Sequence, residues 1–78
     1  MPSVTLVLLA NLRHYAGGEE RLELPFREGA TIADYLRESG VPDHAYYAVV
    51  YRDAVTRDLD AVPAVGDVVE LLPVMSGG

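Results

Sequence analysis

The first and the last apolar runs of the chain share one property that limits the folds open to it. Residues 3–10 (SVTLVLLA) and 67–73 (DVVELLP) carry apolar side chains at both odd and even positions. Neighbouring residues of a strand point to opposite faces of a sheet, so a strand of this kind is covered on both faces. We therefore predict that the two runs form adjacent strands at the centre of one sheet.

A second strand, predicted over residues 21–26 (RLELPF), has a different pattern. Its apolar residues occupy even positions and its charged residues odd ones, which is typical of a strand with one wet face. Pro25 has no backbone N–H and therefore fits an edge strand. Gly17 and Gly18 can supply the positive φ angles of the loop that joins this strand to the first. The pattern predicts a hairpin with residues 21–26 on the outside.

Residues 28–40 (EGATIADYLRESG) predict one short amphipathic helix. Thr31 is the expected N-cap, and Asp34 stands three residues later, as in a short capping box. Gly40 is placed for a left-handed C-terminal cap, and Pro42 prevents continuation. The apolar face of the helix consists of Ile32, Tyr35 and Leu36.

A third strand is predicted over residues 45–51 (AYYAVVY), whereas residues 52–67 hold at most one short strand near Ala54 and Val55. A hairpin followed by a helical crossover places a later strand parallel to the first, with a right-handed connection. We predict an α+β fold of the β-grasp (ubiquitin-like) type, a roll whose mixed sheet of four to five strands packs one main helix on one face. The domain spans residues 1–73, and residues 74–78 form a flexible C-terminal tail ending in Gly-Gly.

Composition excludes several classes of function. The chain has no cysteine and no lysine, and its net charge is −6, so nucleic-acid binding is not expected. No apolar run approaches the roughly 18 residues of a membrane span. The first residues lack the basic segment and the small-residue cleavage site of a secretory signal, so we expect no such signal and a cytoplasmic protein. His14 and His44 fall in different loops, and the spacing of the aspartates does not fit a calcium loop, so no metal site is predicted.

The motifs of the chain resemble those of the ubiquitin-like sulfur carriers, and among them the small subunit of molybdopterin synthase. The resemblance covers essentially the whole sequence. It rests on the segments ANLR (10–13), GG (17–18), LELPFREGATIADYL (22–36), GDV (66–68), LPV (72–74) and the final GG (77–78). It implies a protein that is not an enzyme by itself and acts as a carrier subunit.

Sulfur carriage needs an attachment point, and without cysteine the C-terminal carboxylate of Gly78 is the candidate. An ionised carboxylate is a poor electrophile, so it must be activated, and the chain has no phosphate-binding glycine loop of its own. The resemblance implies activation by a partner adenylating enzyme that uses ATP and magnesium, followed by conversion to a thiocarboxylate with sulfur from a donor protein. We expect Val74, Met75, Ser76 and Gly77 to thread the tail into the partner.

A lone helix covers one sheet face only, so part of the other face is predicted to be an exposed apolar patch, which marks a partner surface. The resemblance implies docking to the adenylating enzyme and to the large subunit of molybdopterin synthase. The residues expected to bind partners are Leu9, Arg13, Ala54, Leu72 and Pro73, and we expect Leu9, Ala54 and Leu72 to form one apolar patch that provides the docking energy. For Arg13 two roles stay open, since it can bind a partner carboxylate or fasten its own loop.

Two other functions remain open from the sequence. A protein modifier would join Gly78 to a target lysine by the same activation chemistry, although the absence of lysine excludes ordinary lysine-linked chains of this protein. A β-grasp binding module would leave the tail without a role. If the chain is a sulfur carrier, we expect it to act in molybdopterin biosynthesis. Thiamine synthesis, tRNA thiolation and cysteine synthesis are the alternative pathways.

Overall fold

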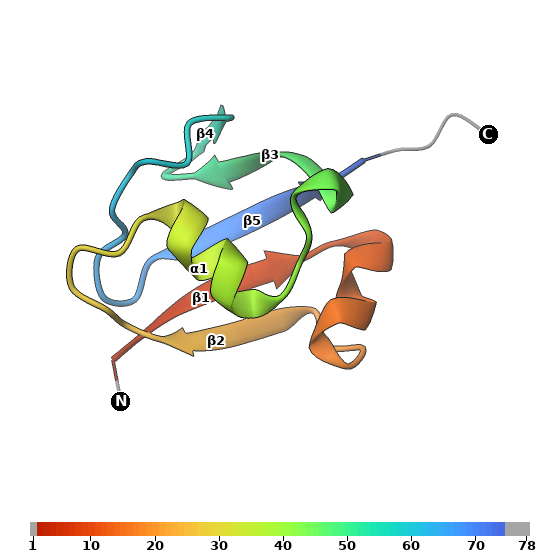
Figure 1. Cartoon of the computed structure of the whole chain (residues 1–78), viewed down its shortest axis with the longest axis horizontal. Coiled ribbons are helices and arrows are strands. Elements are labelled where there is room, and N and C mark those ends of the chain that lie inside the picture. Colours follow the sequence, from red (N-terminus) through yellow and green to blue (C-terminus); the bar gives the residue numbers. More distant parts are fainter. Residues whose placement is uncertain (1, 75–78) are drawn as a thin grey trace.

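A five-stranded mixed sheet with the strand order β2-β1-β5-β3-β4 is the framework of the computed structural model, which describes residues 2–74 (Figure 1). One α-helix and two short 3-10 helices complete it. The elements are β1 (Ser3–Leu8), η1 (Ala10–Ala16), β2 (Arg21–Pro25), α1 (Ile32–Ser39), η2 (Asp43–Ala45), β3 (Tyr46–Tyr51), β4 (Ala54–Thr56) and β5 (Val68–Pro73).

The first and last strands lie side by side inside the sheet, as predicted. β1 is parallel to β5, with Thr5 opposite Val68, and antiparallel to β2. β5 is antiparallel to β3, which forms a hairpin with β4. β2 is an edge strand, so Pro25 removes no hydrogen bond that an outer neighbour would need. The predicted α+β, β-grasp fold class is therefore confirmed.

The predicted boundaries of α1 are confirmed by its caps. The Thr31 hydroxyl accepts a hydrogen bond from the Asp34 amide at 3.2 Å, and the Asp34 carboxylate accepts one from the Thr31 amide at 2.9 Å. This capping box satisfies two backbone donors at the helix start. Gly40 ends the helix with a φ of 85°, a left-handed conformation that costs glycine little.

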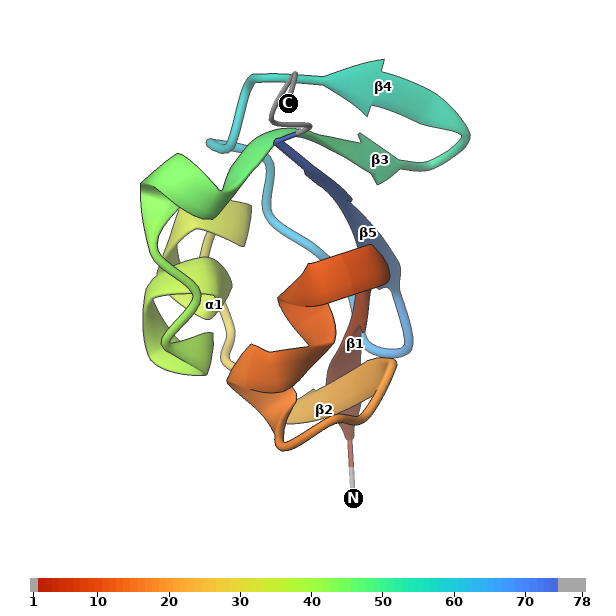
Figure 2. The same cartoon turned by 90° about the vertical axis from the view of Figure 1, so that its right-hand side faces the viewer.

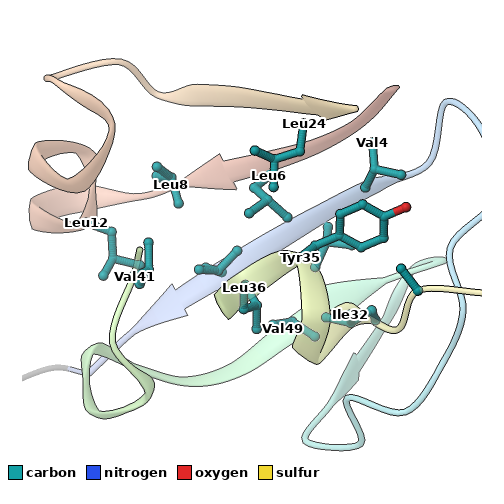
Figure 3. Close-up of a cluster of buried hydrophobic side chains, with 13 residues drawn as sticks. Val4, Leu6, Leu8, Leu12, Leu24, Ile32, Tyr35, Leu36, Val41 and Val49 are labelled. Carbon is teal, nitrogen blue, oxygen red and sulfur yellow. The ribbon is translucent and has the colours of Figure 1, made fainter. Parts of the chain in front are cut away.

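The core lies between α1 and one face of the sheet (Figure 3). Figure 2 shows α1 on one side of the sheet, and no helix among residues 2–74 covers the other side. Tyr35 is completely buried, and its hydroxyl accepts a hydrogen bond from the Arg27 amide at 2.8 Å. The other core residues include Val4, Leu6, Leu8, Leu12, Leu24, Ile32, Leu36, Val49, Val69 and Leu71.

The segment between β1 and β2 differs from the prediction. The first strand was expected to reach residue 10, but it ends at Leu8, and the 3-10 helix η1 follows. Leu12 of η1 is buried in the core, which provides a packing reason for the helix. Gly17 ends η1 at a φ of 66°, so the positive φ predicted there is confirmed.

Candidate functional site

The chain leaves the sheet at the end of β5, and its last described residue is held in place. Pro73 lies opposite Tyr46 of β3, and the Val74 amide donates a hydrogen bond to the Ala45 carbonyl at 3.1 Å. The direction of the chain at Val74 is therefore set by both β3 and η2. Four predicted site residues lie outside the described part of the chain, namely Met75, Ser76, Gly77 and Gly78.

The two 3-10 helices border a hollow of about 220 Å³ beside Val74. His14 of η1 and His44 of η2 both line it, although the sequence places them in separate loops. The Nδ1 of His14 lies 2.7 Å from the Asn11 carbonyl, which can only accept, so this nitrogen carries the proton. Among the described residues, no group of three or more His, Cys, Asp or Glu side chains could hold a metal ion.

Arg13 projects from η1 and is exposed. Its Nε donates a hydrogen bond to the Ala10 carbonyl at 3.3 Å, within its own loop. No ion pair within residues 2–74 involves its guanidinium group. Of the two roles open to Arg13, the structure shows the fastening of its own loop, and partner binding stays a prediction.

The side of the sheet away from α1 presents a mainly apolar surface, here called the open face. Registers across β1, β5, β3 and β4 place its members on one side, because paired residues share a face. Leu72 lies opposite Ala48, Glu70 lies opposite both Val7 and Val50, and Val50 lies opposite Val55. The apolar centre of the open face consists of Val7, Ala48, Val50, Val55, Val68 and Leu72, with Glu70 among them, and Val7 and Ala48 are themselves buried. On the same side, Thr5, Arg21 and Glu23 extend the face towards the β2 edge.

Two predicted docking residues relate differently to the open face. Leu9 is extended (φ −92°, ψ 153°), so the alternation of β1 places it on the side of Val7. Ala54, by contrast, lies opposite Tyr51 of β3, whereas Leu72 lies opposite Ala48. Ala48 and Tyr51 are three positions apart in the strand, so their side chains point to opposite faces. Ala54 therefore belongs to the other face. The prediction that Ala54 and Leu72 form one patch is wrong, because the alternation along β4 brings Val55 to the open face instead.

No helix among residues 2–74 has the length and apolar character needed to cross a membrane.

The carboxylate of Asp67, just before β5, connects the end of β3, the turn after it and the loop that precedes β5. Oδ2 of Asp67 accepts hydrogen bonds from the Tyr51 hydroxyl at 2.6 Å and from the Ala64 amide at 2.9 Å, and Arg52 approaches it at 3.4 Å. The bond from Tyr51 is the main reason that the pKa of Asp67 is lowered. Burial, followed by this same bond, raises the pKa of Tyr51. Asp67 is therefore ionised and Tyr51 protonated at neutral pH, which are the states in which a phenol donates a hydrogen bond to a carboxylate.

Near the other end of β5, the pKa of Tyr46 is raised by burial and then by the negative charge of Asp43. Its phenol is therefore protonated at neutral pH and cannot act there as a base.

Comparisons with known proteins agree with this fold. Residues 6–78 match the model of the ThiS family. A protein described as molybdopterin converting factor, subunit 1, from Pyrococcus furiosus has a similar structure, with a TM-score of 0.73 and 20% identity over 96% of this chain and 100% of that one. SAMP1 from Haloferax volcanii is similar with a TM-score of 0.72 and 24% identity, over 97% and 99% of the two chains. A search of curated proteins finds no significant match.

Proposed function

Because this chain belongs to the ThiS family, we propose that it carries sulfur as a thiocarboxylate on Gly78 and donates it in molybdopterin biosynthesis. The family match confirms the resemblance to ubiquitin-like sulfur carriers. The choice of pathway is supported by the name of the Pyrococcus furiosus protein that shares the fold. Thiamine synthesis, tRNA thiolation and cysteine synthesis are the alternative destinations of the sulfur.

The observation that carries the proposal is the position of β5. This strand is paired on both sides, and Val74 is held by the Ala45 carbonyl. Residues 75–78 thus follow a rigid base, and at roughly 3.3–3.6 Å per residue they can extend about 13 Å from it. A base of this kind is suited to inserting Gly77 and Gly78 into a partner's active site.

The activation chemistry belongs to the partner. A carboxylate oxygen of Gly78 attacks the α-phosphorus of ATP, pyrophosphate leaves, and an acyl-adenylate forms, with magnesium and ATP held by the adenylating enzyme. Hydrosulfide then attacks the carbonyl carbon, AMP leaves with its bonding electrons, and the S–H proton is lost to solvent. The product is a thiocarboxylate, which the large subunit of molybdopterin synthase would use to thiolate its pterin precursor.

Intact-mass spectrometry tests this proposal. The protein is incubated with a cognate adenylating enzyme, ATP, magnesium and hydrosulfide, and the expected result is a mass gain of one sulfur-for-oxygen exchange located at Gly78. A chain lacking Gly77 and Gly78 is the matched control and should gain nothing. An unchanged mass with an enzyme of proven activity would exclude the carrier role, and adducts on partner lysines would instead support a protein modifier.

A further inference from the structure

One charged residue lies in the middle of the open face. Glu70 of β5 has Val7 of β1 on one side and Val50 of β3 on the other. Along its own strand, Val68 and Leu72 are the nearest residues on the same face, since side chains alternate with a period of two. The nearest positions in all four directions on this face are therefore apolar.

The Glu70 carboxylate forms no ion pair within the part of the chain that the structure describes, where the three ion pairs use Asp34, Glu38 and Asp67. The residue is partly buried. Arg21 lies opposite Val7 on β2, and Val7 lies opposite Glu70 on β5. The backbones of Arg21 and Glu70 are therefore two strand spacings apart, roughly 10 Å at about 4.8 Å per strand. Arg52 lines the same hollow as Glu70 but pairs with Asp67 at 3.4 Å. Covering Glu70 with a purely apolar surface would therefore remove water from a carboxylate that has no ion pair, which is strongly unfavourable.

A hollow of about 330 Å³ lies next to this carboxylate. Val50, Val68 and Glu70 of the open face line it, together with the Arg52–Asp53 turn and the start of β5. The hollow is large enough to admit one long side chain from a partner. An arginine would suit it, because its aliphatic stem can contact the valines while its planar guanidinium pairs with a carboxylate in two parallel hydrogen bonds.

We infer that the open face docks onto an apolar surface of the adenylating enzyme that carries one arginine, and that this arginine pairs with Glu70. The inference rests on the proposed function, because it describes the partner of the same carrier. Charge complementarity is the basis for this choice, and the net charge of −6 also favours a basic partner. A second copy of this chain fits less well, since a two-fold contact between open faces would bring one Glu70 towards the other.

Binding measurements test the paired charge. Titration calorimetry compares wild type, Glu70→Gln and Glu23→Gln against the adenylating enzyme at low and high salt. Glu23 is the matched control, since it shares the face of Thr5 and Val68 but lies on the edge strand β2. We expect Glu70→Gln to bind about tenfold more weakly or worse and to lose much of the salt dependence. Glu23→Gln should bind within about twofold of wild type. Equal affinities for wild type and Glu70→Gln would overturn the inference.

Self-association provides a second test that needs no enzyme. Sedimentation equilibrium compares wild type, Glu70→Leu and Glu23→Leu. We expect Glu70→Leu to dimerise at concentrations where the other two remain monomers, because it makes the open face continuously apolar. A Glu70→Leu protein that stays monomeric, or a wild type that dimerises through this face, would overturn the inference.

The two proposals fail in different ways. If the wild-type chain gains sulfur and Glu70→Gln binds the enzyme as tightly as wild type, the carrier function is supported and the pairing of Glu70 with an arginine is refuted. If binding depends on Glu70 as expected but the chain never gains sulfur, the docking surface is supported and the proposed function is refuted. A wild type that does not bind the enzyme at all overturns both.

Discussion

Replacement of Asp67 by asparagine should destabilise the fold by an amount that follows from its contacts. The carboxylate accepts hydrogen bonds at 2.6 Å and 2.9 Å from Tyr51 and Ala64, and its side chain is only 24% exposed. A bond to a charged acceptor contributes about 1 kcal/mol more than a neutral one. Two such bonds predict a loss of about 2 kcal/mol, while the longer contact to the exposed Arg52 adds little. For a domain of this size the melting temperature should fall by roughly 10 °C.

The effect should depend on pH in a defined direction. The folded-state pKa of Asp67 is lowered, so its carboxylate stabilises the fold above the unfolded pKa of about 4, and this stabilisation is lost as the pH falls through the folded pKa. Asparagine does not titrate. The difference in free energy of unfolding between wild type and Asp67→Asn should therefore be full at pH 7 and shrink below about pH 4.

Urea unfolding at pH 7 and again below about pH 4 measures this difference in the free energy of unfolding. Asp60→Asn is the control, because Asp60 is exposed and should change the free energy of unfolding by no more than about 0.5 kcal/mol. A difference for Asp67→Asn that is below about 0.5 kcal/mol at pH 7, or that does not change at low pH, would refute the reasoning.

Three further predictions concern the helix cap, the open face and the tail. Thr31→Ala removes the hydroxyl that accepts the Asp34 amide and should lower the free energy of unfolding by about 1 kcal/mol; an unchanged denaturation midpoint would contradict the capping role. Leu72→Arg should weaken binding to the adenylating enzyme by roughly 2 kcal/mol or more, measured by titration; affinity equal to wild type would remove Leu72 from the docking surface. Gly78 lies beyond β5, so Gly78→Ala should change the free energy of unfolding by no more than about 0.5 kcal/mol, but it should block sulfur gain in the mass assay. A variant that gains and transfers sulfur at the wild-type rate would contradict the role of Gly78.

Much of the fold could be predicted because its signals are local. The capping residue Thr31, the terminal Gly40 and the edge residue Pro25 each act through their immediate neighbours, and all three predictions are confirmed. The central pairing of β1 with β5 was also predictable, because apolar residues on both faces of a strand indicate cover on both sides.

The 3-10 helix η1 was missed, although a weak signal for it exists. Leu9, Leu12 and Tyr15 recur every third residue, which is the period of a 3-10 helix. This spacing is short and ambiguous, and the helix is stabilised by burial of Leu12 in a core formed by distant segments.

The arrangement of the site needed three-dimensional information. His14 and His44 are brought to one hollow by two separate helices, and no sequence spacing encodes that proximity. The face of Ala54 depends on the register of a three-residue strand, where a shift of one position exchanges the two faces.

The central position of β5 also has a consequence for the order in which the protein folds. Before Val68–Pro73 is available, β1 and β2 can form one hairpin and β3 and β4 another, but no other strand joins them. Completing the sheet requires closure of the long loop between Thr5 and Val68, a slow step for a chain of this length. During synthesis, which proceeds from the N-terminus, the two hairpins must therefore wait for β5 with their inner edges unpaired. The strand that presents the tail is also the one whose arrival completes the fold, so a chain able to display its tail in this geometry has already folded.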